Sequence, residues 1–341
     1  MDLNELLKKL SRSSAPAGYE AQMSRLAVQL LEPYCDEVRT DVMGSVIATR
    51  RSSNPNARTV MLDAHIDEVG FVITGAEGGF LRFAAMGVDA RMLPASMIKV
   101  LTEPPIYGVV DVMPPHLLKD GEGEKAIKVE DLYIDVGLSQ EEAEKIPVGT
   151  SAVYATEPLD LNNKLLSAKA MDDRACFAAI VRALELLGEE KLDFNLVVLA
   201  SVQEEVGLRG AKPAAFAVAP DYCIVTDVDF GLAPDSKPHQ GKKLGSGTVI
   251  SIGPNMNRAF TDKIIAIAKE NEIKHTIAVE PGGNSGTNAQ AIQVAQSGVA
   301  TALLGVPLRY MHTPGETLDL ADVESLAQLI CAVLRGVDFN A

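Results

Sequence analysis

Residues 196–211 read LVVLASVQEEVGLRGA, and this passage carries the clearest fold signal in the chain. Residues 196–202 form a nearly unbroken apolar run, which has the length of a buried strand. A strand that is apolar at almost every position is covered on both faces, as in a parallel sheet with helices on each side. A helix is expected near residues 210–218. The passage therefore predicts one strand–helix unit of an α/β fold.

The same alternation extends to both sides of this unit. Further buried strands are expected at 45–49, 59–64, 222–226 and 299–306. The expected helices are a helix–loop–helix over about the first 35 residues, a helix that Asp172 or Asp173 caps, helices near 261–271 and 288–296, and a final helix over 319–335. This order predicts an α/β fold with a mostly parallel sheet sandwiched by helices.

Residues 70–163 have a different character. They contain short β-rich runs at 71–74, 97–101, 108–112 and 151–155, separated by Gly, Pro and acidic turns, and one short helical pattern at 139–145. Strand runs at this spacing are typical of a compact barrel or sandwich. We therefore expect a catalytic α/β domain made of residues 1–69 and 164–341, interrupted by an inserted small β-barrel-like domain over 70–163.

The composition is that of a globular protein and excludes several classes. The chain has 341 residues, 47% of them hydrophobic, and a formal net charge of −15. Because Lys and Arg are not clustered and no apolar run is long enough to span a bilayer, we expect no nucleic-acid partner and no membrane partner. The N-terminus lacks the pattern of a signal peptide, and the four Cys are widely spaced among apolar neighbours, so we expect a cytoplasmic protein with reduced thiols.

Acids and imidazoles follow four of the predicted buried strands. They are His65 after the run at 59–64, Glu204 and Glu205 after 196–202, Asp227 after 222–226, and His312 a short distance after 299–306. In an open α/β sheet, ligands bind outside the carboxyl ends of the strands. These side chains are therefore expected to meet at one edge of the sheet.

Each of these residues has a structural interpretation beside the functional one. His65 and Asp67 share a face of an extended segment, so Asp67 can hold the second ring nitrogen of a metal-bound His65; the alternative is a satisfied core histidine. Of the Glu204–Glu205 pair, one carboxylate can bind a metal while the other moves a proton; the alternative is two acids favoured by a helix N-terminus.

Asp172 can either cap a helix or bridge two cations with its two carboxylate oxygens. Carboxylates with two imidazoles and no thiolate suit Zn²⁺, Co²⁺ or Mn²⁺. A pair of metal ions needs about five protein ligands, one of them shared. Five candidates meet this requirement and leave Glu204 and Asp67 for support: His65, Asp172, Glu205, Asp227 and His312.

Five segments resemble the signatures of the M42 family of metallo-aminopeptidases, the group of glutamyl and tetrahedral aminopeptidases. They are HIDEVG (65–70), AMDDR (170–174), QEEVGLRGA (203–211), DV (227–228) and RYMHTP (309–314). The resemblance spans nearly the whole chain in the same order, and the QEEVGLRGA string is quite specific. It implies the phosphorylase/hydrolase-like zinc peptidase fold, peptide substrates, and two divalent metal ions per subunit.

The resemblance also implies roles for the individual residues. Asp172 would bridge the two metal ions, with His65 and Asp227 on one of them and Glu205 and His312 on the other. The two remaining residues would be catalytic: Glu204 as the general base toward a metal-activated water, and Asp67 as the partner of His65.

Three further features come with the resemblance. The insertion would mediate assembly into a homo-oligomer, commonly of dimers that form a tetrahedral dodecamer, and the peptide bond between Asp172 and Asp173 would be cis. Family members commonly have Gly where this chain has Cys176, whose side chain either crowds the bridging carboxylate or simply packs.

The expected activity is hydrolysis of N-terminal residues from peptides. The alternatives are an endoglucanase-type glycoside hydrolase, which needs two carboxylates flanking a sugar cleft, an N-acyl deacylase that uses the same metal pair, and a catalytically silent binding protein. The preferred N-terminal side chain stays open between acidic, basic and neutral, and the residues expected to line its pocket are the Gly-rich loop 282–288 and Arg309.

Overall fold

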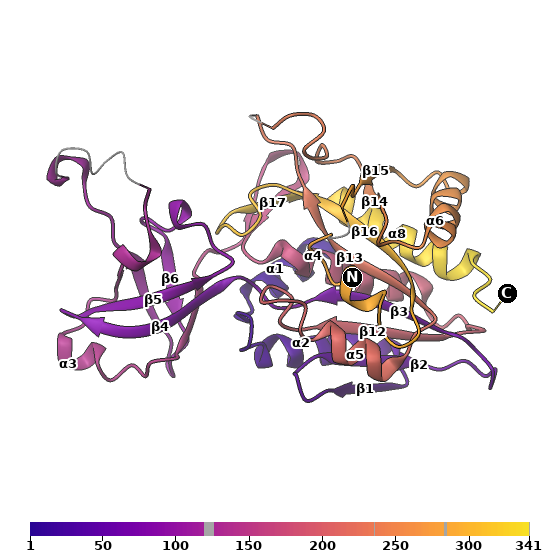
Figure 1. The fold of residues 1–341 in the computed structure, drawn as a ribbon, viewed down its shortest axis with the longest axis horizontal. Coiled ribbons are helices and arrows are strands. Elements are labelled where there is room, and N and C mark those ends of the chain that lie inside the picture. Colours follow the sequence, from indigo (N-terminus) through magenta and orange to yellow (C-terminus); the bar gives the residue numbers. More distant parts are fainter. Residues whose placement is uncertain (119–125, 235, 283–284, 341) are drawn as a thin grey trace.

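The computed structural model describes residues 1–118, 126–234, 236–282 and 285–340. Figure 1 shows a larger part built around a mixed sheet and a smaller β-rich part beside it. The larger part contains an eight-stranded sheet in the order β1-β2-β12-β3-β13-β16-β14-β15. The bounds of these strands are β1 Glu37–Thr40, β2 Val46–Arg50, β3 Thr59–His65, β12 Asn195–Ser201, β13 Tyr222–Phe230, β14 Thr248–Ile252, β15 His275–Val279 and β16 Ala300–Leu308.

The sheet is parallel at its centre and mixed toward its edges. Strands β12, β3, β13 and β16 run parallel to their neighbours within this group. The pairs β1–β2, β2–β12 and β14–β16 are antiparallel, whereas β14 and β15 at one edge are parallel, so the sheet is mixed although most of its strand pairs are parallel as expected. The carboxylate of Asp41 accepts the backbone N–H groups of Met43, Gly44 and Ser45, and this tight turn makes β1 and β2 antiparallel.

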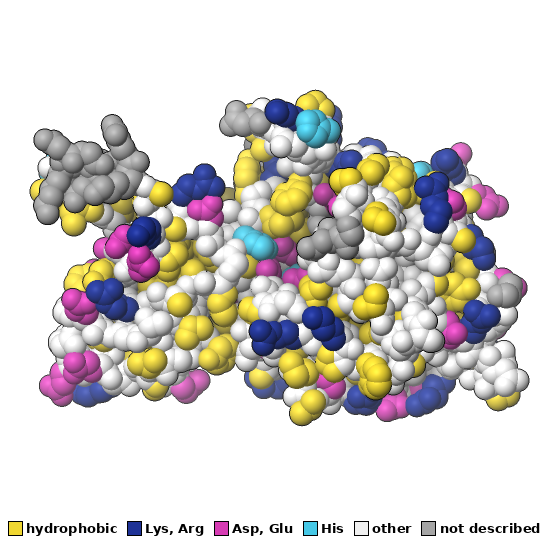
Figure 2. Space-filling model, viewed as in Figure 1, with side chains coloured by type: hydrophobic (Ala, Val, Ile, Leu, Met, Phe, Trp, Pro, Cys, Tyr) yellow, Lys and Arg dark blue, Asp and Glu magenta, His cyan; other side chains and the backbone are white. Residues whose placement is uncertain are grey.

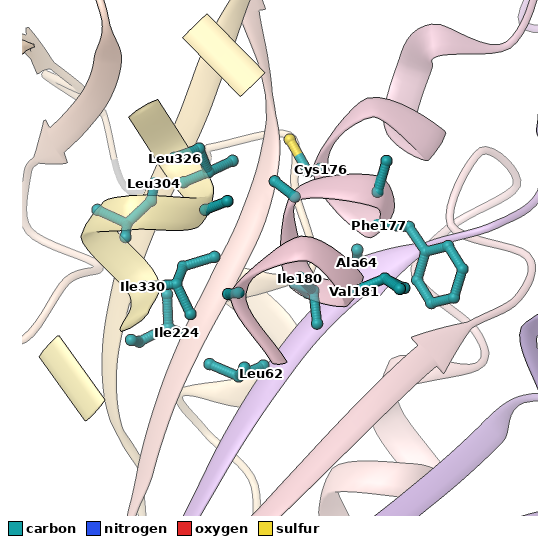
Figure 3. Packing of buried hydrophobic residues seen from close by; sticks show 14 of the residues in the cluster. Leu62, Ala64, Cys176, Phe177, Ile180, Val181, Ile224, Leu304, Leu326 and Ile330 are labelled. Atoms are coloured by element: carbon teal, nitrogen blue, oxygen red, sulfur yellow. The ribbon is translucent and has the colours of Figure 1, made fainter. Parts of the chain in front are cut away.

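Helices cover both faces of the sheet. Helices α1 (Leu3–Arg12), α2 (Ala21–Leu31), α4 (Met171–Leu187), α6 (Arg258–Glu270) and α8 (Leu320–Gly336) pack on one face, and the short helices α5 (Ala211–Val218) and α7 (Ala289–Ile292) on the other. Figure 3 shows Leu62 and Ala64 of β3 beside Ile180 and Val181 of α4. Met61, the residue before Leu62 in sequence, faces the second cluster, which explains why apolar side chains lie on both faces of the strand.

The smaller part is a closed barrel of six strands in the order β4-β5-β8-β7-β6-β9. The strands are β4 Gly70–Glu77, β5 Phe80–Met86, β6 Met97–Val100, β7 Ile106–Val110, β8 Ile134–Asp135 and β9 Ser151–Tyr154. A core of its own fills the barrel, in which Phe71 packs edge-on against Phe83 and Tyr154. The expected small β-barrel is therefore present.

Several element bounds differ from the expected ones. The helix expected at 139–145 is the four-residue α3 (Gln140–Ala143), and the one expected at 288–296 is α7 alone. Strands β14 and β15 were not expected, and a further antiparallel sheet joins β10 (Leu159–Asp160), β11 (Leu165–Ala168) and β17 (Glu316–Asp319). The 3₁₀ turns are Glu32–Tyr34, Ala90–Met92, Pro115–Leu117, Val129–Asp131 and Asn162–Lys164. In the part of the chain that the structure describes, no helix has the length and apolarity needed to cross a bilayer.

Candidate metal centre

The predicted site residues come from the ends of the central strands and from two loops. His65 is the last residue of β3, and Glu204 and Glu205 lie three and four residues after β12, its parallel neighbour. His312 lies in the loop between β16 and β17. Figure 2 shows a histidine side chain and acidic side chains together at the surface where the barrel meets the larger part. The sheet thus brings residues far apart in sequence to one region.

Asp172 lies between the two histidines. Its Oδ1 is 3.1 Å from Nε2 of His65, and its Oδ2 is 3.2 Å from Nε2 of His312. The same Nε2 of His312 is 3.2 Å from Oε1 of Glu205. Each oxygen of the Asp172 carboxylate therefore faces a different imidazole.

The backbone at Asp172 is unusual for the start of a helix. The Asp172–Asp173 peptide bond is cis, as expected from the resemblance. Asp172 and Asp173 have non-helical backbone angles, and the N-cap residue of α4 is Ala170, whose side chain makes no capping hydrogen bond. The capping interpretation of Asp172 is therefore wrong, because its carboxylate faces the imidazoles instead of the backbone N–H groups.

Asp227 lies inside β13, three residues before the strand ends, and not beyond its end as expected. Its neighbour Gly305 on β16 has no side chain, which leaves the two strands paired through this position. Ligand atoms of Asp227, His65 and Asp172 lie within 4.8 Å of one another, as do those of Asp172, Glu205 and His312. The five residues thus form two groups that share Asp172.

The pKa values of His312, His65 and Asp227 are raised because the site holds several buried carboxylates and few positive charges. Burial alone would lower the pKa of His312, but the carboxylates of Asp172 and Glu205 outweigh it and raise that pKa to about 11. Burial also opposes the charge on His65, whose pKa the carboxylates of Asp172 and Asp67 nevertheless raise well above its ordinary value. Burial, helped by the negative charges of Asp173 and Asp172, raises the pKa of Asp227. Cations would relieve this crowding of carboxylates.

The donor set fits divalent metal ions of the zinc type. Three carboxylates and two imidazoles supply oxygen and nitrogen donors, and one carboxylate offers an oxygen to each group. The carboxyl group of Glu204 lies within electrostatic range of His65, Glu205 and Asp67, and its Oε1 is buried with no hydrogen-bond partner among the described residues. Burial raises the pKa of Glu204 to about 8, and the charges of Glu205 and Asp67 contribute to this rise against the opposing effect of His65.

Asp67 is fully buried and contacts three groups of the site. Its Oδ1 accepts the N–H of Glu204 at 3.1 Å, and its Oδ2 accepts the N–H of Glu205 at 3.2 Å. The Oδ1 atom is also 3.4 Å from Nδ1 of His65. The sequence pattern pointed to the histidine, whereas the two backbone contacts to the Glu pair were not expected.

Two further carboxylates support the site, and no motif pointed to them. Glu20 accepts the N–H groups of Gly18 at 2.6 Å and Gln203 at 3.2 Å with one oxygen, and so holds the residue before Glu204. Glu316, at the start of β17, accepts backbone N–H groups next to Asp172 and at His312. Their only sequence signal is an acid beside a glycine or a ligand, which is too common to be informative.

A buried ion network lies beside the site. The Glu68 carboxylate accepts from Lys169 Nζ at 2.7 Å and from a guanidinium nitrogen of Arg174 at 3.0 Å. Arg174 also donates to the carbonyl oxygens of Leu10 at 2.8 Å and Ser13 at 2.6 Å. This network ties the N-terminal segment to the start of α4.

The other residues that the sequence singled out lie as follows. Cys176 is buried in the apolar cluster on the first turns of α4 (Figure 3), so it packs in the core, and its thiol also hydrogen-bonds the Asp173 carboxyl group. Within the loop 282–288, Gly283 and Asn284 lie outside the described residues, while Asn288 donates to Asp63 and Ser201 at 2.9 Å. The Nε of Arg309 donates to the carbonyl oxygen of Leu232 at 2.6 Å.

The barrel also borders the site. A Cβ atom placed on Gly87, in the loop after β5, would lie 2.6 Å from Cγ1 of Val69 and 3.5 Å from Oε2 of Glu205. The loop therefore lies next to the Glu205 carboxylate, and because of Val69 this position accepts no side chain without movement.

Comparisons with known proteins agree on one family. The family model described as M42 glutamyl aminopeptidase matches residues 44–329. The lysyl aminopeptidase of Pyrococcus furiosus is 38% identical over 351 residues, covering 98% of this chain and 99% of that protein.

Two solved structures have the same fold along almost the whole chain. An aminopeptidase from the archaeon Desulfurococcus kamchatkensis superposes with a TM-score of 0.91 at 33% identity, covering 98% of this chain and 95% of its own. The TET1 peptidase of Pyrococcus horikoshii, which can assemble into a tetrahedron or a large octahedral shell, has a TM-score of 0.85 at 32% identity, covering 98% and 100%.

Proposed function

Because this chain belongs to the M42 glutamyl aminopeptidase family, we propose that its buried cluster of acids and imidazoles holds the two metal ions of an aminopeptidase. The chain is a metal-dependent aminopeptidase, an enzyme that hydrolyses the peptide bond after an N-terminal residue. The observation that carries the proposal is the Asp172 carboxylate, whose two oxygens face two different imidazoles.

The proposed ligand sets follow the two groups of donor atoms. His65 and Asp227 hold one ion, Glu205 and His312 hold the other, and Asp172 bridges both. Zn²⁺ and Co²⁺ suit these donors, and Mn²⁺ accepts them as well. The supporting evidence is the mixture of donors, their closeness and the shared carboxylate.

A bound pair of divalent ions supplies Lewis acidity toward the peptide carbonyl and lowers the pKa of water. Glu204 takes a proton from the attacking water and passes it to the leaving amine, so that one carboxylate serves first as base and then as acid. Its unpartnered, buried Oε1 supports this role. Asp67 orients His65 and, through the N–H groups of Glu204 and Glu205, fixes the base relative to the ligands.

The comparisons favour this activity over the alternatives from the sequence. Both the family model and the curated relative carry an aminopeptidase description, so the glycoside hydrolase and the deacylase are not favoured. We propose peptides as the substrates. We also propose a cytoplasmic location, which the four free cysteines support.

We further propose that residues 70–163 form an inserted domain through which the subunits assemble into a homo-oligomer, as dimers that build a tetrahedral dodecamer. The outer face of the barrel supports this role. Met97 on β6 pairs with Val109 on β7, and these side chains are 49% and 37% exposed, while Tyr107 on the same strand is 56% exposed. An exposed surface with adjacent apolar side chains of this kind favours association between subunits.

The proposed role of Glu204 is tested by the substitution Glu204→Gln. The amide has the same shape but cannot take a proton, so turnover of an aminoacyl chromogenic substrate should fall by about 10² to 10⁴. Elemental analysis should still find two metal ions per subunit, since Glu204 is not a ligand. The exposed Glu189 offers a matched control, and Glu189→Gln should leave turnover unchanged. Near-normal turnover of Glu204→Gln would show that the base is another group.

The metal dependence is tested separately with the unmodified protein. Chelation with EDTA should abolish hydrolysis of free N-terminal residues, and added Zn²⁺ or Co²⁺ should restore it. A substrate with an acetylated N-terminus should not be hydrolysed. Activity that survives complete metal removal would contradict the proposed mechanism.

A further inference from the structure

Glu316 is a buried carboxylate that contacts both loops carrying the proposed metal ligands. It is the first residue of β17, which pairs with β11 and places Glu316 opposite Ala168. The residue is only 1% exposed. Ala168 lies just before the segment that leads to Asp172, so the strand pairing brings Glu316 beside the start of α4.

Both oxygens of Glu316 accept backbone hydrogen bonds. The Oε2 atom accepts the N–H of Met171 at 2.6 Å and the N–H of Asp172 at 3.1 Å. The Oε1 atom accepts the N–H of His312 at 2.8 Å. One side chain therefore connects a segment of α4 with the loop between β16 and β17.

Neither segment is held by a regular backbone ladder at these positions. Ala170, before Met171, has φ of 57°, and His312 has φ of 62°, so both lie in the left-handed region that costs a side chain energy. The first N–H groups of a helix have no partner within the helix. Glu316 satisfies two such groups, those of Met171 and Asp172, and in addition the N–H of His312 in its loop.

We propose that Glu316 is a positioning residue. It holds Asp172 and His312 at the separation needed to bind the second metal ion, which is the ion assigned to Glu205 and His312. This inference rests on the proposed function, because it takes Asp172 and His312 as ligands. Glu316 itself contributes no ligand in this assignment. It acts through the backbone of one ligand from each of two loops.

The chemistry of the contacts requires a carboxylate. With glutamine, one of the two terminal atoms becomes an NH₂ group, which cannot accept a hydrogen bond from a backbone N–H. Either rotamer then places a donor against a donor, at His312 or at Met171 and Asp172. Glu316→Gln should therefore release one loop while keeping the size of the side chain.

The test measures metal binding as well as activity. Metal-free protein is titrated with Co²⁺, and the ions bound per subunit are followed by elemental analysis and by the visible absorption of the cobalt site. We expect Glu316→Gln to bind the second ion 10- to 100-fold more weakly than the wild type, the effect typical of residues that orient ligands. At Co²⁺ concentrations that give two ions in the wild type, the variant should hold one, and kcat should fall more than KM rises.

Asp322 provides a matched control. It is 1% exposed and uses both oxygens to accept backbone N–H groups, from Gly245 at 2.7 Å and Gly247 at 2.6 Å. It contacts none of the proposed ligands in the described part of the chain. Asp322→Asn should lower the melting temperature, yet it should bind two Co²⁺ ions with wild-type affinity.

The outcomes separate this inference from the proposed function. If Asp172→Asn loses both ions while Glu316→Gln binds two ions as the wild type does, the positioning role is wrong and the metal site stands. If Asp172→Asn also keeps two ions, the proposed function itself fails. Should Glu316→Gln not fold, the titration is repeated with Glu316→Asp, whose shorter side chain cannot reach both loops; wild-type binding by that variant would equally overturn the inference.

Discussion

At the scale of single residues, this chain uses buried carboxylates to hold backbone N–H groups. Asp67, Glu20, Glu316 and Asp322 each accept two or more such groups. Several of the acidic residues that contribute to the formal net charge of −15 therefore lie in the interior of the protein. The pKa of a buried acid of this kind depends on the balance of two effects, because burial disfavours ionisation while the N–H groups favour it.

Asp322 should give a measurable pH dependence of stability. Burial raises its pKa from 3.8 to about 6, against the N–H groups of Gly245 and Gly247. The folded state then binds the proton more tightly than the unfolded state, so the stability from Asp322 is present below about pH 4 and is lost toward pH 6. Asp322→Asn removes this dependence. The difference in melting temperature between Asp322→Asn and the wild type should therefore increase in favour of the variant as the pH rises from 4 to 6.

The comparison is made with metal-free protein, so that both proteins contain the same remaining acids and their effects cancel in the difference. Asp319→Asn serves as a neighbouring control, since that residue caps α8 but lies nearer to solvent. A difference in melting temperature that stays constant from pH 4 to pH 6 would show that Asp322 has an ordinary pKa.

The sequence predicted the candidate ligands but not the residues behind them. His65, Glu205 and Asp227 could be found because acids and imidazoles at the ends of apolar strands are a visible pattern. The ligand roles stay predictions. Glu316 and Glu20 act by accepting backbone N–H groups, a task that any nearby acid can perform. Only the positions of the loops show which acids do so.

At the scale of the elements, the pairing of β13 with β16 controls where Asp227 lies. Gly305 of β16 pairs with Asp227, and a Cβ atom at Gly305 would lie 2.1 Å from the carbonyl oxygen of Asp227. A side chain there would push the two strands apart. Glycine is thus required at this position for the close approach of the strands.

Gly305→Ala should both destabilise the fold and weaken metal binding. We expect a loss of about 1–3 kcal/mol in the free energy of unfolding, as for an overpacked core position. Because the carbonyl of Asp227 must move, the ion that this residue is proposed to hold should bind more weakly. Urea unfolding and metal analysis measure the two effects.

Gly75 of β4 offers the control for this substitution. A Cβ atom at Gly75 meets nothing within 4 Å, so Gly75→Ala should change the free energy of unfolding by less than about 0.5 kcal/mol. Equal stability of the two alanine variants would mean that the strands at Gly305 can separate without cost.

The central elements could be predicted more closely than the peripheral ones. Strands β3, β12 and β16 lie within about one or two residues of the expected runs, because burial on both faces makes them continuously apolar. Strands β14 and β15 are near the sheet edge, where a five-residue run with polar positions gives no clear period. Asp227 was expected beyond its strand, because Asp is usually unfavourable within a strand and its role in the site was not visible locally.

At the scale of the whole molecule, the barrel is both an outer surface and a wall of the site. Its loop at Gly87 approaches Glu205, while Met97, Val109 and Tyr107 lie on its outer face.

The double substitution of Met97→Glu with Tyr107→Lys should reduce the oligomeric state. Charges on this apolar face would have to be buried upon assembly, which is costly. Light scattering coupled to size exclusion should show a smaller particle than the wild type, with unchanged circular dichroism. As a control, Val42→Lys alters an exposed apolar side chain on the turn between β1 and β2 and should leave the particle size unchanged. A double variant of wild-type size would place the interface elsewhere.

The hydrogen bonds of Arg174 connect the first residues of the chain to the segment that carries Asp172. The guanidinium donates to the carbonyl oxygen of Leu10, 164 positions earlier in the sequence, and Arg174 lies two positions after Asp172. Removal of the first fifteen residues would take two acceptors from this buried cation, the carbonyl oxygens of Leu10 and Ser13, and leave its contacts with Ile66 and Glu68. We therefore expect truncation at the N-terminus to lower the activity of the subunit, although every proposed ligand would remain.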